Sequence, residues 1–177
     1  MFTMKNLNRV LKEIPALDQT NPYSINKNKV SYKLQQISSC RQRGYAVEAM
    51  IRDELILMGY KVDHLGFRCS YDLRVDGNRV EVKSALARTK KLVRSGKTYE
   101  TYDFQNIKTD CFDYLVLVFI TPNGPIRRML TQEQAEDMLR FNTEYSQGKT
   151  MSFDTRNKLP GEDFDRFWQE NFSQVAA

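Results

Sequence analysis

The stretch from Tyr71 to Ser84 constrains the fold more than any other part of the chain. It reads Y-D-L-R-V-D-G-N-R-V-E-V-K-S, with apolar residues at every second position on both sides of a turn sequence at Asp76-Gly77-Asn78. This alternation predicts a β-hairpin with one buried face. A two-residue loop at Asp76-Gly77 or at Gly77-Asn78 keeps the apolar residues on one face, whereas a three-residue loop would turn one strand over.

Either two-residue register places Asp72, Glu81 and Lys83 together on the face opposite the apolar residues. Two neighbouring carboxylates suit a divalent cation such as Mg²⁺, which prefers one or two carboxylates, water and substrate phosphate. With a lysine to bind the phosphate, the three residues suit metal-assisted hydrolysis of a phosphodiester bond. A solvated hairpin face shows the same alternation of charged residues, so the pattern leaves both interpretations open.

Length and charge indicate a single domain, residues 1–177, with a polyanionic partner. The chain has 177 residues, 41% of them hydrophobic, and a net charge of +5. Between Arg79 and Lys108 there are eight Lys and Arg against three Asp and Glu. This segment follows the carboxylates directly in sequence, so we expect its basic residues next to them, in contact with a nucleic-acid backbone. The basic residues concerned are Arg88, Lys90, Lys91, Arg94 and Lys97. A lysine-protected edge hairpin is the alternative.

Several classes of protein are disfavoured. The first 17 residues lack the apolar core of a signal peptide, and the longest apolar run, Tyr114–Ile120, is too short to span a membrane, so we expect a soluble cytoplasmic protein. Three widely spaced cysteines favour neither a zinc site nor disulfides. His64 is the only histidine, which excludes an HNH-type site and favours a structural role at a strand end. There is no P-loop, so no nucleotide cofactor is expected.

The remaining pattern predicts an α/β (α+β) fold in which helices flank a mixed central sheet. Gly44–Gly59 has the clearest helical period, with Glu48 near its expected start, where a carboxylate complements the helix dipole. Tyr114–Thr121 is a continuous apolar run typical of a strand buried on both faces. Helices are further expected at Met1–Pro15, Val30–Cys40, Thr131–Phe141 and Glu162–Phe172, and strands at Tyr60–Leu65, Ile126–Leu130 and Met151–Asp154.

These motifs together resemble the PD-(D/E)XK nuclease superfamily, which includes restriction and homing endonucleases, Holliday-junction resolvases and repair nucleases. The resemblance covers about Gly44 to Thr121, and Tyr71 replaces the proline that names the motif. It implies a restriction-endonuclease-like core at about 44–130, with helical additions at both ends. It also implies that Asp72 and Glu81 bind the metal, that Lys83 is the catalytic lysine and that Glu48 completes the site. Gln105 stands where many members carry a further polar site residue.

The expected function is therefore Mg²⁺-dependent cleavage of double-stranded DNA, with Mn²⁺ able to substitute, by a site-specific enzyme of the restriction or homing type. A homodimer or higher homo-oligomer would provide one active site for each DNA strand. A Holliday-junction resolvase or repair nuclease on the same fold is an alternative that the sequence does not separate. A nucleic-acid-binding protein without catalysis is an alternative of another class, against which the intact Asp72, Glu81 and Lys83 argue.

Overall fold

The structure is a computed structural model that describes residues 27–65, 69–91, 96–142, 147–155 and 157–172. The helix expected at Met1–Pro15, together with Arg94 and Ser95, lies outside these residues. The helices are α2 (Lys27–Gln36), α3 (Cys40–Leu57), α4 (Gln132–Leu139) and α5 (Phe164–Phe172), with a 3-10 turn at Thr109–Cys111. The strands are β1 (Val62–His64), β2 (Leu73–Val75), β3 (Asn78–Lys91), β4 (Thr98–Ile107), β5 (Tyr114–Thr121), β6 (Gly124–Thr131), β7 (Lys149–Asp154) and β8 (Glu162–Asp163).

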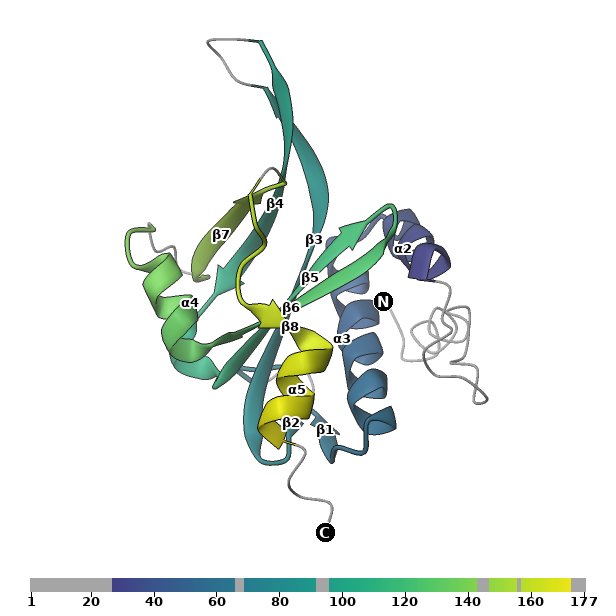
Figure 1. Ribbon diagram of the computed structural model, residues 1–177, viewed down its shortest axis with the longest axis vertical. Coiled ribbons are helices and arrows are strands. Elements are labelled where there is room, and N and C mark those ends of the chain that lie inside the picture. Colours follow the sequence, from purple (N-terminus) through teal and green to yellow (C-terminus); the bar gives the residue numbers. More distant parts are fainter. Residues whose placement is uncertain (1–26, 66–68, 92–95, 143–146, 156, 173–177) are drawn as a thin grey trace.

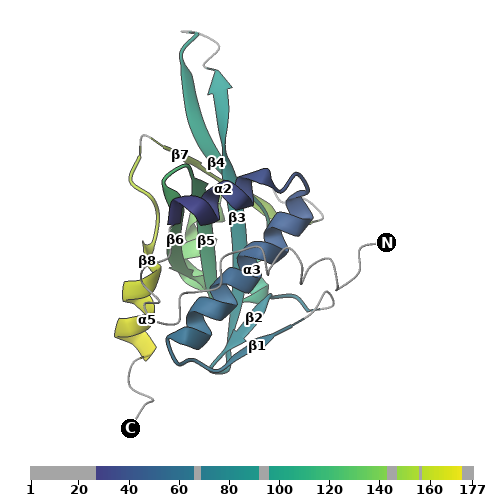
Figure 2. The ribbon, with the colours of Figure 1, turned by 90° about the vertical axis from the view of Figure 1, so that its right-hand side faces the viewer.

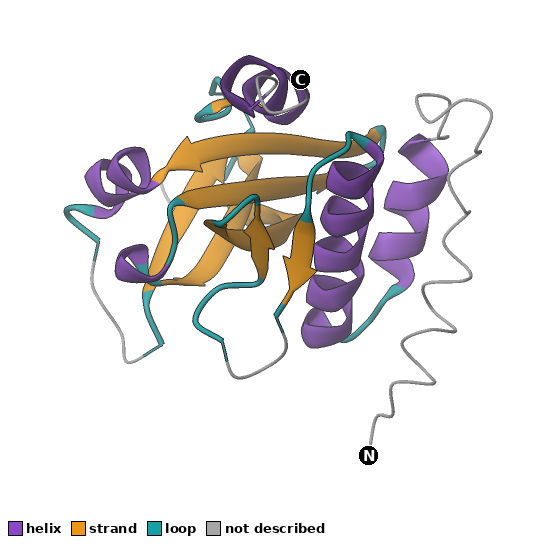
Figure 3. Ribbon diagram, turned by 90° about the horizontal axis from the view of Figure 1, so that it is seen from below, coloured by secondary structure: helices purple, strands orange, loops and turns teal. Residues whose placement is uncertain are grey.

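The eight strands found in the described residues belong to one mixed sheet, which confirms the expected mixed α+β class. The strand order is β1-β2-β3-β5-β6-β8, with β4 paired to β3 and β7 paired to β4. Only β3 and β5 run parallel to each other among these pairs. Seen from below in Figure 3, the strands lie between the helices α2 and α3 on one side and α4 on the other.

The central hairpin forms with the first of the two predicted registers. Leu73 pairs with Val80 and Val75 with Asn78, so the loop is Asp76-Gly77. Both loop residues have positive φ angles, 47° at Asp76 and 90° at Gly77. A two-residue turn of this hand matches the twist of the flanking strands, and Asp-Gly is among the sequences that favour it.

The sheet buries an apolar core on each face. Strand β5 supplies alternate residues to both, because successive side chains of a strand point to opposite faces. Val116, Val118 and Ile120 pack with α2, α3 and α5 in the first core. Leu115, Leu117 and Phe119 pack with α4, β4 and β7 in the second. The prediction of a central strand buried on both faces is confirmed.

Helix α3 begins four residues earlier than predicted. Ser39 caps it by accepting a hydrogen bond from the Gln42 amide, and the helix ends before Gly59, which has a φ of 95°. A glycine in this conformation is the usual helix stop. Glu48 is thus the ninth residue of α3 and not part of its first turn. The helix dipole, which acts mainly within the first turn, does not account for a carboxylate at this position.

The other predicted elements are found with shifted ends. Helix α2 covers Lys27–Gln36, not Val30–Cys40, β1 contains only Val62–His64, and α5 begins at Phe164 after the short strand β8. The predicted capping box of Thr131 and Gln134 is present at the start of α4. Of the helices in the described ranges, none combines the length and apolar character needed to cross a membrane.

Strands β3 and β4 continue beyond the rest of the sheet as a two-stranded arm. The pairs from Ala87–Tyr102 to Lys91–Thr98 form this arm, and β7 pairs with β4 only as far as Thr101. Figures 1 and 2 show the arm projecting from one end of the molecule, while β1 and β2 lie at the opposite end. The hairpin that carries Asp72 and the arm that carries the basic segment are therefore at different ends of β3.

Candidate active site

Asp72 and Glu81 are held side by side by the register of the central hairpin. The Asp72 amide donates to the Val80 carbonyl at 3.1 Å. The Asp72 carboxylate in turn accepts a hydrogen bond of 2.8 Å from the Val82 amide. Asp72 is thus bonded to both chain neighbours of Glu81, Val80 and Val82. Glu81 itself is only 8% exposed. The shared face predicted from the alternation is present.

Lys83 lies on the same face and forms an ion pair with the Glu81 carboxylate. Its side chain is 22% exposed and that of Glu81 is 11% exposed, so water screens the pair little. Burial lowers the pKa of Lys83, but the carboxylates of Glu81, Asp72 and Glu48 outweigh it and raise this pKa above its ordinary value. Lys83 therefore remains charged throughout the physiological range of pH.

Glu48 reaches the same cluster from α3. Its side chain is 14% exposed. Burial, followed by the charge of Asp72, raises the pKa of Glu48 to about 8, although Lys83 acts in the opposite direction. Burial likewise raises the pKa of Glu81 to about 7, with Lys83 lowering it and Asp72 raising it. The three carboxyl groups hold more negative charge than the single lysine balances, so part of it is neutralised by protons near pH 7.

His64 is the residue of this cluster that sequence reasoning missed. It is the last residue of β1, where a structural role was predicted, and it pairs with Leu73 beside Asp72. Its Nε2 atom lies 3.6 Å from a carboxylate oxygen of Glu48. Burial and the nearby charge of Arg52 lower the pKa of His64. Only the pairing of β1 with β2 brings it here, and no motif in the sequence signals that pairing.

The basic residues are not next to the carboxylates, contrary to the prediction. Arg88, Lys90 and Lys91 lie on the arm, and Lys97 directly precedes its second strand. Lys91 is eight residues beyond Lys83 on the same strand, which corresponds to about 26 Å at the usual rise of a strand. The basic residues and the carboxylates are close in sequence but distant in space, because one long extended strand separates them.

The exposed side chains of the arm include Arg88, Lys91 and Lys97. Lys90 is partly buried and forms an ion pair of 3.1 Å with Asp103, which also accepts a hydrogen bond of 2.7 Å from Ser152. Lys90 therefore also links β3 to β4 through this ion pair. Arg94 lies outside the described residues.

The role predicted for Gln105 in the site stays a prediction. Its side chain is exposed on β4, and in the described part of the chain no hydrogen bond or ion pair links it to Asp72, Glu81 or Lys83. The prediction for Gln105 rested on sequence position alone. The structure gives it no support.

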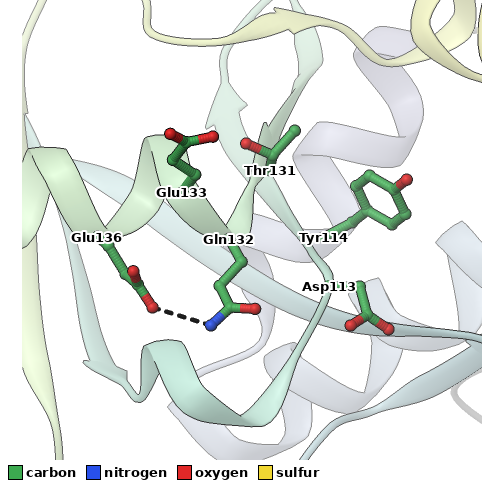
Figure 4. Close-up of a pocket in the computed structure, with 6 residues that line it drawn as sticks. All are labelled: Asp113, Tyr114, Thr131, Gln132, Glu133 and Glu136. Carbon is green, nitrogen blue, oxygen red and sulfur yellow. Dashed lines mark hydrogen bonds between the residues drawn. The ribbon is translucent and has the colours of Figure 1, made fainter.

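A shallow hollow of about 360 Å³ lies elsewhere, at the start of α4 (Figure 4). It contains none of the predicted site residues. One lining residue, Asp113, is bound by the Arg79 guanidinium at 2.7 Å and by the Arg79 amide, which joins the start of β5 to β3. The hollow is lined by Asp113, Tyr114, Thr131, Gln132, Glu133 and Glu136. Its acidic character does not suit a nucleic-acid phosphate.

Within the described ranges, no three His, Cys, Asp or Glu side chains lie close enough together to enclose a metal ion as they stand. The Lys83 ammonium occupies the position beside Glu81 for which a cation would compete. The carboxylates nonetheless form the hard oxygen donor set that Mg²⁺ and Mn²⁺ prefer. Their unbalanced charge is the electrostatic condition for cation binding.

Comparisons with known proteins find solved structures of similar fold but no match in sequence. No known protein family matches the chain, and no curated protein matches it either. The fold is similar to that of I-Ssp6803I, a bacterial homing endonuclease, with a TM-score of 0.47 and 18% sequence identity. The similarity covers 79% of this chain and 100% of that chain.

Proposed function

We propose that this protein is a metal-dependent DNA endonuclease of the PD-(D/E)XK kind, which uses Mg²⁺ or Mn²⁺ to hydrolyse phosphodiester bonds in double-stranded DNA. One observation carries the proposal: Asp72, Glu81 and Glu48 gather around Lys83, and the pKa values of Glu48 and Glu81 are raised to about 8 and about 7. Perturbed carboxyl groups around a buried lysine are typical of a catalytic site.

The donor set fits a hard divalent cation. Asp72, Glu81 and Glu48 would hold it, and binding would replace the protons that now neutralise Glu48 and Glu81. A bound ion supplies charge neutralisation for the phosphate and lowers the pKa of a bound water. The side chains that hold it come from one helix and one hairpin, both fixed by the apolar core that contains Val47, Leu73 and Val80.

Lys83 acts on the phosphate. Its ammonium is largely buried and permanently charged, so it stabilises the negative charge that develops on the phosphate oxygens more strongly than an exposed lysine would. Asp72 is fixed by the Val82 amide and therefore presents its carboxylate in one orientation. Pre-orientation of this kind reduces the reorganisation that the reaction requires.

The arm provides DNA contacts away from the cleaved bond. Arg88, Lys91 and Lys97 are exposed there and would bind backbone phosphates, with Lys90 as a partial contributor and Arg94 as a further candidate. A distance of roughly 25 Å along β3 between Lys83 and the end of the arm spans about seven base pairs of B-form DNA. One molecule would then grip the DNA well away from the bond that it cuts.

A site-specific enzyme of the restriction or homing type that cuts both strands would act as a homodimer or higher homo-oligomer, with one active site for each strand. A resolvase or repair nuclease on the same fold would prefer a branched or damaged substrate. The two forms of the proposal differ in substrate and not in the chemistry of the site. The same experiment separates them.

The test incubates purified protein with supercoiled plasmids that carry a wide range of sequences and, separately, with a four-way junction, in Mg²⁺ or in EDTA. Glu81→Gln and Lys83→Ala are compared with Glu133→Gln, which removes a carboxylate from the hollow on α4. We expect discrete cutting that needs the metal and falls at least 100-fold in Glu81→Gln and Lys83→Ala. Glu133→Gln should cut like the wild type.

Discrete cuts in the plasmid favour the site-specific enzyme, and selective cutting of the junction favours the resolvase. Salt-sensitive DNA binding without cutting in Mg²⁺, Mn²⁺ or other divalent ions would contradict the nuclease. It would instead support the non-catalytic binding protein.

A further inference from the structure

The face of the central hairpin that carries Asp72 and Glu81 continues toward the turn with two arginines. Arg74 of β2 pairs with Arg79 of β3. Because successive side chains of a strand point to opposite faces, Arg74 lies on the same face as Asp72, two residues further along. Two residues correspond to about 6.8 Å at the usual rise of a strand. The two guanidinium groups therefore lie beside the candidate active site.

The two arginines differ in what balances their charge. Arg79 donates hydrogen bonds to the Asp113 carboxylate, from Nη2 at 2.7 Å and from Nε at 3.2 Å. Arg74 is exposed and forms no ion pair with a carboxylate of the described residues, including Asp63, which pairs with it from β1. Since like charges opposite each other destabilise a hairpin, the fold gains little from a positive charge at Arg74.

Tyr71, which stands at the proline position of the PD-(D/E)XK motif, holds the Arg74 side chain. The Arg74 Nη2 atom donates a hydrogen bond of 2.6 Å to the Tyr71 hydroxyl, and the centre of the guanidinium lies 5.9 Å from the centre of the ring. Toward the described residues, the Tyr71 hydroxyl and the other N–H groups of Arg74 donate no hydrogen bond. The pair thus offers donors only, which suits a phosphate, whose oxygens only accept.

A phosphate that enters the candidate active site needs positive charge nearby. The carboxyl groups there share one lysine, so the site carries a surplus of negative charge when they are ionised, and this charge repels a phosphate. The arm is at the other end of β3 and does not offset the repulsion. Arg74 places an exposed cation on the face of the site itself.

We propose that Tyr71 and Arg74 form a subsite for a backbone phosphate of the DNA strand that is cut, within about two nucleotides of the cleaved bond. This inference rests on the proposed function. The position follows from the spacing of about 6.8 Å between Arg74 and Asp72, because the phosphates of one strand follow at about 3.4 Å of helix axis. The contact is separate from those proposed for the arm.

DNA that carries single neutral phosphates tests the subsite. A fluorescently labelled duplex contains the cut position mapped for the wild type, and in each version a methylphosphonate replaces one phosphate within three nucleotides of the cut. Binding is measured in EDTA, so that neither cutting nor a metal contributes. We expect one replacement, at most about two nucleotides from the cut, to weaken binding by the wild type about tenfold and binding by Arg74→Ala hardly at all.

The unmodified duplex gives the cost of each side chain. Arg74→Ala should bind about tenfold more weakly, with a salt slope smaller by about 0.9 because one phosphate contact is lost. Arg74→Lys should retain the slope, since it keeps the charge. Tyr71→Phe keeps the ring but loses the hydroxyl, so it should bind about threefold more weakly with the slope unchanged.

Arg140→Ala is the matched control, because Arg140 is also exposed and lies over an aromatic ring, that of Phe141, at 5.7 Å. It follows the end of α4 and should bind DNA like the wild type. The Tm of Arg74→Ala should be close to that of the wild type. The comparison between replaced phosphates is made within one variant, so a change in its stability does not produce the expected difference.

Two outcomes overturn the subsite in different ways. If the wild type binds and cuts DNA, and every methylphosphonate weakens Arg74→Ala as much as the wild type, only the subsite is wrong. If the wild type binds no DNA, or binds DNA and cuts none, the proposed function is wrong and the subsite with it.

Discussion

At the scale of single residues, the central fact is that three carboxylates share one largely buried lysine. A carboxyl group whose pKa is higher in the folded chain than its ordinary value of 4.5 binds more protons when folded than when unfolded. The free energy of unfolding then decreases as the pH rises between the two values. Glu48, with a pKa of about 8, and Glu81, with a pKa of about 7, both act in this direction.

The variant Glu48→Gln tests this electrostatic description. Glutamine has nearly the same shape and is neutral at every pH, so the variant lacks the contribution that Glu48 makes to the loss of stability above about pH 4.5. We expect the Tm of Glu48→Gln to be close to that of the wild type at pH 5 and higher at pH 8.5. The measurement is thermal unfolding across pH in EDTA, with Glu133→Gln as the control for removal of an exposed carboxylate.

A Tm difference between Glu48→Gln and the wild type that stays constant from pH 5 to pH 8.5 would contradict a raised pKa at Glu48. The same result would weaken the proposed cation site, because the site depends on unbalanced negative charge. The histidine beside Glu48 does not alter the sign, since burial lowers the pKa of His64 and keeps it neutral over most of this range.

At the scale of elements, β3 carries the candidate catalytic residues at one end and the candidate DNA-contact residues at the other. Its first half pairs with β2 and β5 and carries Glu81 and Lys83 in the body of the protein. Its second half pairs only with β4 in the arm and carries Arg88 and Lys91. The proposed chemistry and the proposed DNA contacts are therefore separable by mutation.

The double variant Arg88→Ala/Lys91→Ala tests this separation. Both side chains are exposed, so the Tm should change little. We expect the salt slope of DNA binding to fall by about 1.8, because two phosphate contacts are lost. The rate of cutting at saturating DNA should stay within about threefold of the wild type. A large loss of that rate would instead place the arm at the cleaved bond.

The same elements show how far the sequence alone leads. Alternation around Asp76-Gly77 predicted the hairpin and the common face of Asp72, Glu81 and Lys83, because only a two-residue turn keeps every apolar side chain buried. The apolar run of β5 and the capping box of α4 could likewise be predicted from the sequence, since each is a local pattern. These features needed no knowledge of the tertiary structure.

The features that the sequence did not reveal depend on contacts between distant segments. Ser39 extends α3 backward by a turn, and so Glu48 is an interior residue of the helix rather than a dipole partner. His64 reaches the cluster through a pairing of β1 with β2 that no local motif encodes. The basic segment lies away from the carboxylates because β3 is 14 residues long and continues beyond Leu86, where its pairing with β5 ends.

At the scale of the whole molecule, one largely buried arginine ties the helix of the candidate site to the rest of the fold. Arg127 of β6 forms ion pairs with Glu54 of α3 and, at 2.9 Å, with Asp165 of α5. Its guanidinium also lies 5.2 Å from the Phe164 ring. The Arg127 side chain is 12% exposed and that of Glu54 is 14% exposed, so water screens this ion pair little.

Arg127→Met should lower the free energy of unfolding by about 3–5 kcal/mol, because the largely buried Glu54 carboxylate loses the cation with which it is paired. The double variant Arg127→Met/Glu54→Leu should recover most of this loss, since it removes both charges and keeps apolar volume. Arg166→Ala is the control: its pair with Glu170 is 72% and 52% exposed, so its loss should leave the free energy of unfolding almost unchanged. Urea unfolding gives all three values.

The same variants show whether Arg127 only stabilises the fold or also acts in the proposed reaction. Glu48 and Glu54 belong to the same helix, so a folded Arg127→Met chain should hold Glu48 less firmly and cut more slowly, while the double variant should regain both stability and cutting. Recovery of stability without cutting would mean that the Arg127 charge itself acts on the substrate. If the double variant recovers neither stability nor cutting, the ion pairs determine how α3 packs against β6 and do not merely stabilise that packing.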